Sequence, residues 1–286
     1  MVVLVTGSNG QLGQSLQFIA KSYPNIDFKF CDSATLDITN LENVKHIFQE
    51  YNPSFCINTA AYTAVDKAES EPEKAFAINV TGAKNLAQVC KEFDTILIHI
   101  STDFVFDGIA IKPYSETDVT NPKSVYGQTK LDGEKAIQAI LEKHIIIRTS
   151  WVYSQFGNNF LKTMLRLGSE KDTLSVVNDQ IGTPTNAVDL ANAILQIIVS
   201  INHQPSTIQS GIYNFSNLGE CSWFDFAKKI FEIHNINIDL KPIPTSSYPT
   251  PAERPKYSVL DKSKIIDTFG IEIISWEESL KTVIFN

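Results

Sequence analysis

Two side chains capable of acid–base chemistry lie four positions apart in Tyr126-Gly127-Gln128-Thr129-Lys130. On a helix this spacing places both on one face. An unperturbed tyrosine titrates at about pH 10, so a nearby cation that lowers its pKa would make it a proton donor or acceptor near neutrality. The pair therefore predicts proton transfer, while a surface tyrosine beside a solvated lysine is the alternative interpretation.

A hydroxyl group is expected beside this pair. Ser101-Thr102-Asp103 follows a predicted strand, Thr95–Ile100, and the carboxyl edge of an open α/β sheet is where ligands bind. The Thr102 hydroxyl could there hydrogen-bond a substrate carbonyl. Thr102, Tyr126 and Lys130 together predict a hydride-transfer site.

A glycine-rich turn supplies the second half of such a site. The first predicted strand leads into Thr6-Gly7-Ser8-Asn9-Gly10-Gln11-Leu12-Gly13. Gly7, Gly10 and Gly13 allow a tight turn, a close approach to a pyrophosphate and close packing of the next helix, whose N-terminal N–H groups face the phosphates. The motif predicts dinucleotide binding, and a strand-to-helix turn without a ligand is the alternative.

An acidic residue at the end of the second predicted strand supports a nicotinamide dinucleotide. Asp32 lies 19 positions after Gly13, close to the spacing at which a carboxylate binds the adenosine ribose. It would also repel a 2′-phosphate, so we expect NADH to bind at least as well as NADPH. A solvated strand-end acid is the alternative. Asp37 is expected near the adenine, and Thr39 or Asn40 is expected to cap the next helix.

The elements that must position these residues follow an α/β pattern. Short apolar runs alternate with helical patterns, which predicts a doubly wound parallel sheet of the Rossmann type. A helix is expected from Ser70, as N-cap with Glu73 as its capping-box partner, to about Cys90. The predicted strands are Val2–Val5, Ile26–Cys31, Ser54–Asn58, Thr95–Ile100 and His144–Arg148.

The chain divides into a dinucleotide-binding domain, 1–150, and a smaller C-terminal substrate-binding lobe, mainly 151–286. After Arg148 the alternation loosens, and proline and asparagine become frequent around Ile181–Asn186 and Lys241–Pro255. Asn214–Asn217 has the character of a strand end that rejoins the sheet. The lobe is therefore expected to be discontinuous, with segments near 174–217 returning to the first domain.

The bulk properties exclude several classes of protein. A net charge of -8 over 286 residues, without a Lys/Arg cluster, argues against nucleic-acid binding. The four cysteines form no CxxC pair and indicate reduced thiols. No apolar run reaches 18 residues, and Val2–Val5 is too short for a signal-peptide core, so we expect a cytoplasmic protein without membrane contact.

Longer strings carry a family resemblance. With TGxxGxxG, a hydroxyl residue at the strand edge and YxxxK, the whole chain resembles the extended short-chain dehydrogenase/reductase superfamily, and within it the dTDP-4-dehydrorhamnose reductases. Many members of the superfamily have serine at the position of Thr102. Threonine at this position agrees with the reductase branch. The strings that carry the narrower resemblance are Asn58-Thr59-Ala60-Ala61-Tyr62-Thr63-Ala64-Val65-Asp66, Ser101-Thr102-Asp103-Phe104-Val105-Phe106, Arg148-Thr149-Ser150-Trp151-Val152-Tyr153, Gly157-Asn158-Asn159-Phe160 and Asn178-Asp179-Gln180.

The resemblance implies a reaction and a set of site residues. It implies reduction of the C4 ketone of a dTDP-linked 4-dehydro-6-deoxyhexose by NADPH or NADH, with Tyr126 as proton donor and Lys130 on the nicotinamide ribose. Thr102 and Asp103 would lie beside the sugar, Trp151 would face its ring, and Arg254 would meet the nucleotide diphosphate. The implied cofactor contacts are Gly10, Gln11 and Leu12 on the pyrophosphate, Asp32, Asp37 and Ile38 on the adenosine half, and Ala61, Tyr62 and Thr63 on the central part.

Some members of this branch are magnesium-linked dimers that use C-terminal acids, so a homodimer and magnesium are both possible. Glu277 and Glu278 lie in the corresponding region, but a solvated helix start after Trp276 explains them, and no metal ligand is assigned. Two other functions share the core residues. These are a nucleotide-sugar 4-epimerase, or a reductase of another ketosugar, and a non-catalytic subunit resembling the regulatory β subunit of methionine adenosyltransferase.

Overall fold

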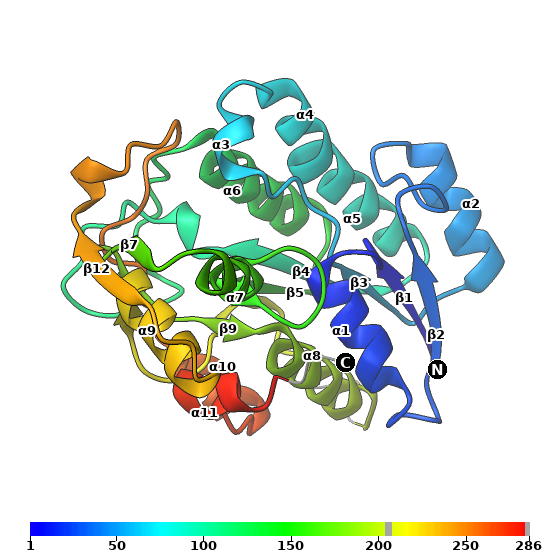
Figure 1. Ribbon diagram of the computed structural model, residues 1–286. Helices are drawn as coiled ribbons and strands as arrows, with labels where there is room; N and C mark the ends of the chain where they lie inside the picture. The colour runs from blue at the N-terminus through cyan, green and yellow to red at the C-terminus, as the bar shows by residue number, and fades with distance from the viewer. Residues whose placement is uncertain (204–207, 284–286) are drawn as a thin grey trace.

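Six parallel strands form the central sheet of the computed structural model, which describes residues 1–203 and 208–283 (Figure 1). All five neighbouring pairs are parallel, which confirms the predicted doubly wound α/β class. The five predicted strands are confirmed to within two residues at each end. In spatial order the strands are β10 (Gly211–Asn214), β5 (His144–Thr149), β4 (Ile96–Thr102), β3 (Phe55–Asn58), β1 (Val2–Thr6) and β2 (Asp27–Cys31).

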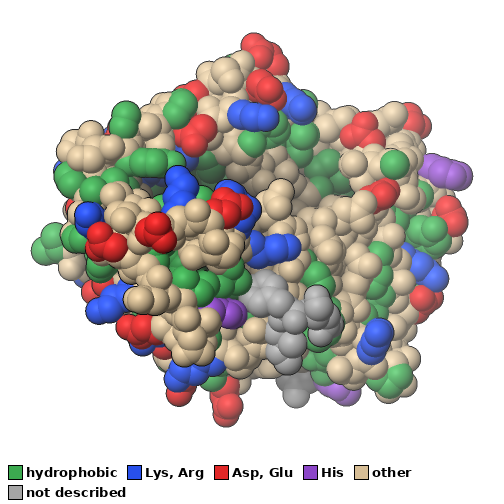
Figure 2. Space-filling view, in the orientation of Figure 1, with side chains coloured by type: hydrophobic (Ala, Val, Ile, Leu, Met, Phe, Trp, Pro, Cys, Tyr) green, Lys and Arg blue, Asp and Glu red, His purple; other side chains and the backbone are tan. Residues whose placement is uncertain are grey.

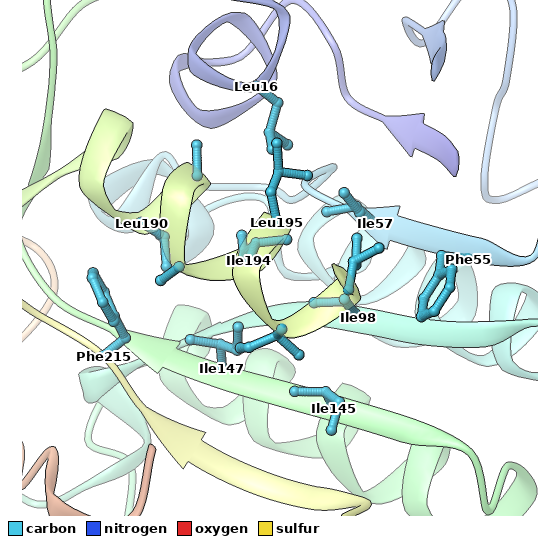
Figure 3. Close-up of a cluster of buried hydrophobic side chains, with 14 of the residues drawn as sticks. Leu16, Phe55, Ile57, Ile98, Ile145, Ile147, Leu190, Ile194, Leu195 and Phe215 are labelled. Carbon is cyan, nitrogen blue, oxygen red and sulfur yellow. The ribbon is translucent and has the colours of Figure 1, made fainter. Parts of the chain in front are cut away.

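Helices cover both faces of this sheet, because alternate side chains of each buried strand point to opposite faces. Val3 and Val5 pack against α1 (Gln11–Ala20) and α8 (Ala187–His203). Leu4, between them, packs on the other face, which is covered by α2 (Leu41–Tyr51), α5 (Ala83–Glu92) and α6 (Val125–Ile140). Figure 3 shows the first of these two layers, where Leu16, Ile147 and Leu195 meet between helices and sheet.

The order in which strands are added to the sheet reverses at β1. The segment after β1 runs outward to β2, whereas β3, β4 and β5 follow on the opposite side of β1. In open α/β sheets the loops at such a reversal diverge and leave a crevice at the carboxyl ends of the strands. The fold therefore places the glycine turn after β1 next to the segment after β3.

The helix predicted from Ser70 to about Cys90 starts differently and is interrupted. Ser70 is not its cap, because the Ser70 hydroxyl donates to the Lys67 carbonyl (3.1 Å). The helix α4 (Pro72–Phe76) has Pro72 at its first position, where a missing N–H costs nothing, so Glu71 becomes the N-cap. A π-helical turn, Ala77–Gly82, then joins α4 to α5. The capping-box prediction was wrong, and the rest of the helix was found.

The second part of the chain has a core of its own. Tyr153, Leu161, Phe226, Ile230 and Trp276 form its centre. It holds α7 (Phe160–Glu170), α9 (Trp223–Ile233), α11 (Trp276–Lys281) and the parallel pair β7 (Thr173–Val177) and β12 (Asp239–Ile243). The smaller elements are α3 (Val65–Ala68), β6 (Val152–Tyr153), β8 (Ile181–Gly182), β9 (Thr185–Asn186), β11 (Cys221–Ser222), α10 (Ser263–Phe269) and the 3₁₀ turns Asp103–Val105 and Thr245–Ser247.

The chain returns to the first layer after β9, where α8 packs on α1 and β10 extends the sheet beside β5. β10 ends at Asn214, in the stretch where a strand end was expected. That the second part binds the substrate stays a prediction at this point.

The core shown in Figure 3 predicts a large loss of stability when it is truncated. Ile147 is fully buried in it, so Ile147→Ala is expected to lower the free energy of unfolding by about 2–5 kcal/mol, and Ile147→Val by about 0.5–1.5 kcal/mol. Ile111, which is 99% exposed, is the matched control, and Ile111→Ala should change it by less than about 0.5 kcal/mol. Urea denaturation measures all three. Equal losses for Ile147→Ala and Ile111→Ala would contradict the packing described.

Candidate active site

A cleft of about 680 Å³ opens at the carboxyl edge of the sheet. Figure 2 shows this face of the molecule hollowed between the α3–α4 segment and α7. A second pocket of about 290 Å³ adjoins it and shares Asn9, Gly10, Thr59 and Ala61 with it. Of the predicted site residues, the larger cleft is lined by Gly10, Gln11, Leu12, Ala61, Thr63, Thr102, Asp103, Tyr126, Lys130 and Trp151, and the smaller by Gly7, Gly10, Asp32, Asp37, Ile38 and Ala61.

The glycine turn has the shape that a dinucleotide requires. Gly7 adopts φ +65°, and a Cβ there would lie 2.7 Å from the Ala60 nitrogen. A Cβ on Gly13 would lie 2.6 Å from the Gly7 carbonyl oxygen, which explains why α1 can start so close to the strand. Gly10 is the N-cap of α1 and has no side chain between the free N–H groups of the helix and the cleft. These residues fit a pyrophosphate.

The two acidic residues that line the smaller pocket are held by local hydrogen bonds. Asp32 Oδ1 accepts from the backbone nitrogens of Ala34 (3.1 Å) and Thr35 (3.0 Å), and Oδ2 accepts from Asn9 Nδ2 (3.1 Å). The hydrogen bonds from Thr35 are the largest of the effects that lower the Asp32 pKa. The carboxylate is therefore charged at neutral pH. Asp37 Oδ1 accepts from the Thr39 nitrogen (2.9 Å). Of the two predicted caps for α2, the structure has Asn40.

The segment after β3 lines the centre of the cleft with two of its three predicted residues. Ala61 and Thr63 face the cleft, whereas the Tyr62 hydroxyl donates to Glu71 Oε2 (2.8 Å) away from it. Asn79, in the π-helical turn, fixes this segment by accepting from the Tyr62 nitrogen (2.9 Å) and donating to the Tyr62 carbonyl (3.2 Å). Asn79 was not predicted from the sequence, because its role depends on the π turn, which has no local sequence pattern.

Tyr126 and Lys130 lie on α6, which begins at Val125 after its N-cap Ser124. Burial raises the pKa of Tyr126 to about 12, a hydrogen bond with Thr102 lowers it, and the charge of Asp103 raises it. The phenol is therefore protonated at neutral pH, which is the form that donates a proton. The lowered pKa expected from the sequence depends also on the positive charge of an oxidised nicotinamide, and it stays a prediction.

The Lys130 amine is engaged away from the phenol. Nζ donates to the Ile100 carbonyl (2.6 Å) and lies 3.4 Å from His99 Nε2. Burial lowers the pKa of Lys130 to about 8, and Glu134 opposes that shift. Tyr126 and Lys130 thus share the cleft as predicted, although the lysine charge is directed toward β4 and not at the phenol.

The cleft contains a buried acid at the end of β4. Asp103 Oδ1 accepts from the Thr102 hydroxyl (3.0 Å), and Oδ2 is buried without a hydrogen-bond partner in the described part of the chain. Burial raises the Asp103 pKa to about 6, against hydrogen bonds with Ser258 and Thr102 that lower it. Such an acid can hold a hydroxyl group of a ligand as donor or acceptor.

Trp151 lines the cleft beside a second tryptophan. Its backbone lies in the left-handed region (φ +46°), and its ring stacks on Trp223 at 3.6 Å between centroids. Trp223, the first residue of α9, also lines the cleft and was missed from the sequence. A lone tryptophan after a helix cap has no spacing that points to a site.

Arg254 lies outside the cleft. Its Nη2 forms an ion pair with Asp66 Oδ2 (2.8 Å), and its guanidinium lies 5.9 Å from the centre of the Phe104 ring. Phe104 does line the cleft, so Arg254 is next to the site and already has a carboxylate partner. Its predicted contact with a diphosphate would require that pair to open, and it stays a prediction.

One of the two C-terminal acids belongs to a helix cap. Ser275 caps α11 in a capping box, in which Glu278 Oε2 accepts a hydrogen bond from the Ser275 nitrogen (3.3 Å). Within residues 1–203 and 208–283, no group of three or more His, Cys, Asp or Glu side chains is arranged to hold a metal ion.

Comparison with known proteins identifies the family of this chain. A family model described as the RmlD substrate binding domain matches residues 1–286. A curated dTDP-4-dehydrorhamnose reductase from Aggregatibacter actinomycetemcomitans is 41% identical over 288 residues, covering 98% of this chain and 97% of that protein. The chain belongs to the dTDP-4-dehydrorhamnose reductase family.

Solved structures of the dTDP-4-dehydrorhamnose reductase family share the whole fold. A reductase of this name from Clostridium acetobutylicum is 44% identical, with a TM-score of 0.92 over 98% of this chain and 97% of that one. One from Bacillus anthracis, in complex with NADP, is 42% identical, with a TM-score of 0.90 and the same coverage.

The hydrogen bonds of Asp32 suggest a test of cofactor preference that removes its charge and keeps the turn. Asp32→Asn removes the charge and keeps an oxygen for the Ala34 and Thr35 nitrogens, so kcat/KM for NADPH relative to NADH should rise by about two- to fivefold, the effect of one exposed charge. Asp37→Asn is the matched control, because Asp37 lines the same pocket and accepts a similar bond. Steady-state kinetics with both cofactors measure the ratio, and an unchanged ratio in Asp32→Asn would assign Asp32 to the turn alone.

Proposed function

We propose that this protein reduces the C4 ketone of dTDP-4-dehydro-β-L-rhamnose with NADPH or NADH, giving dTDP-L-rhamnose, as a step in deoxysugar synthesis for cell-surface polysaccharide. The observation that carries the proposal is the full-length family match together with one cleft that holds the glycine turn, Thr102, Tyr126 and Lys130. An active ketoreductase needs all of these groups.

The side chains divide the chemistry among them. When bound, the reduced nicotinamide supplies the hydride for the ketone carbon. Tyr126 donates its phenolic proton to the ketone oxygen, and its raised pKa keeps that proton in place at neutral pH. The Thr102 hydroxyl orients the same oxygen, while Lys130 holds a ribose hydroxyl. A protonated phenol is the form that reduction of a ketone requires.

The sugar is proposed to bind on the Asp103 and Trp151 side. Asp103 is the buried acid with an unpartnered oxygen, suited to a sugar hydroxyl, and the paired rings of Trp151 and Trp223 offer an apolar wall for a deoxyhexose. In this proposal the cofactor occupies the glycine turn, and its adenosine half lies in the smaller pocket with Asp32, Asp37 and Ile38. The division into a cofactor domain, 1–150, and a substrate lobe belongs to the same proposal.

We place the reaction in the cytosol, which is supported by four buried, free cysteines. Among the described residues, no helix is both long and apolar enough to traverse a lipid bilayer. The homodimer and the magnesium that the family resemblance suggests stay predictions.

A product analysis tests the function. The purified protein is mixed with dTDP-4-dehydro-β-L-rhamnose and NADPH or NADH, with UDP-linked ketosugars in parallel. Loss of cofactor absorbance equal to the sugar converted, with dTDP-L-rhamnose identified by NMR, is expected. An epimerase would change the sugar without net loss of NAD(P)H, and a non-catalytic subunit would change neither, so either result would refute the proposal.

Removal of the phenol tests the proton donor. Tyr126→Phe keeps the ring and deletes the hydroxyl, so kcat should fall by about 10²–10⁴-fold while the Kd for NADPH stays within about twofold. Tyr213→Phe is the control, because that hydroxyl donates to the Gln209 carbonyl in the core, away from the cleft. Stopped-flow turnover and fluorescence titration give the two constants. Turnover near that of the unmodified protein would remove Tyr126 from the mechanism.

A further inference from the structure

Three buried polar side chains lie in a row beneath the cleft and have no part in the proposed reaction. Thr6 on β1, Asn58 on β3 and His99 on β4 are aligned in neighbouring strands and are at most 1% exposed. The Thr6 hydroxyl donates to Asn58 Oδ1 (2.7 Å), and Asn58 Nδ2 lies 2.9 Å from His99 Nδ1. His99 Nε2 in turn lies 3.4 Å from the Lys130 amine. The row therefore ends at a residue of the site.

The backbone fixes the orientation of the Asn58 amide. The Ala60 nitrogen donates to Asn58 Oδ1 (3.1 Å), and a backbone N–H can only donate. Turning the amide over would place its NH₂ group against that N–H and leave two donors facing each other. Asn58 Nδ2 is therefore the atom that faces His99, and it donates to His99 Nδ1.

This orientation determines the tautomer of His99. A neutral imidazole has one nitrogen that accepts and one that donates, so if Nδ1 accepts from Asn58, the proton lies on Nε2. Burial, followed by the charge of Lys130, lowers the pKa of His99 well below its ordinary value, so the ring is neutral. The Nε2–H then points at the Lys130 amine. A neutral amine can accept that hydrogen, whereas an ammonium group has only donors.

Of the other groups around Lys130, Glu134 favours the ammonium form, although its carboxylate is shared with another cation. Glu134, one turn along α6, is paired with Arg148 from β5 (2.7 Å). Tyr126 is neutral at neutral pH, and Asp103, after β4, interacts with Thr102 and raises the pKa of Tyr126. The Ile100 carbonyl accepts from Lys130 (2.6 Å) whether the lysine is charged or neutral.

We propose that His99 is a positioning residue whose Nε2–H, aimed by Asn58, opposes the ammonium form of Lys130 and so makes that amine easy to deprotonate. The inference deepens the proposed function and rests on it for the role of Lys130 in the reaction. The proton affinity of Lys130 is nevertheless a property of the protein alone, and it can be measured without a substrate.

NMR titration of the full-length protein with ¹³C-labelled lysine tests the inference. The Cε resonance of Lys130, identified by its absence in Lys130→Met, should titrate below the other lysines. In His99→Phe, which keeps a ring and removes both nitrogens, the midpoint should rise by about one pH unit or more. His144→Phe is the matched control, because His144 is a buried histidine that contacts the Leu141 carbonyl, and there the midpoint should not move. An unchanged midpoint in His99→Phe would overturn the proposal.

A second measurement uses the unmodified protein and does not depend on whether His99→Phe folds. The ¹⁵N shifts of the His99 ring, assigned by elimination with variants of the other four histidines, should show a protonated Nε2 and an unprotonated Nδ1. The reverse tautomer would overturn the proposal. If the tautomer and the midpoint are as expected but no ketosugar is reduced, the proposed function fails while the inference about His99 stands.

Discussion

A buried ion pair holds the helix with the reactive side chains against the sheet. Glu134, on α6, accepts two hydrogen bonds from Arg148 on β5 (2.9 and 2.7 Å) and one from Ser101 on β4. The bidentate geometry fixes both the rotation and the height of the helix. Tyr126 and Lys130 lie one to two turns before Glu134, so their place over the strand end that carries Thr102 follows from this pair.

Burial of two charges is expensive, and an apolar pair of the same shape can be as stable. Both side chains of the ion pair are at most 2% exposed. The pair therefore positions the helix as much as it stabilises the fold. A helix held by apolar contacts alone can rotate or slide with little change in buried area. The ion pair allows one arrangement, and a reaction that moves a hydride and a proton between fixed atoms requires one arrangement.

The architecture could be predicted from the sequence because its signals are local. Apolar runs of strand length, the glycine spacing after β1 and the acid after β2 each depend on residues close in the chain, and parallel strands bring their carboxyl ends to one edge. For that reason we expected one cleft to contain Gly10, Thr102 and Tyr126, which are far apart in sequence. All three line the same cleft in the structure.

The rest depends on contacts between distant segments. Asn79 matters because a π turn directs it at Tyr62, and Trp223 because α9 of the second core brings it onto Trp151. The ion pair of Arg254 with Asp66 joins residues 188 positions apart. The raised pKa of Tyr126 and the direction of the Lys130 amine could not be predicted for a related reason, since burial and that direction exist only in the folded chain.

The backbone and the side chain of Trp151 favour different residues at this position. Its left-handed backbone would suit glycine, and a bulky residue there stores about 1–3 kcal/mol of strain, while its ring is what faces Trp223 and the cleft. Substitution by glycine would relax the backbone and remove the wall. For thermal stability this strain is set against the stacking of Trp151 on Trp223, so an engineered thermostable version should be screened for turnover whenever residue 151 is allowed to vary.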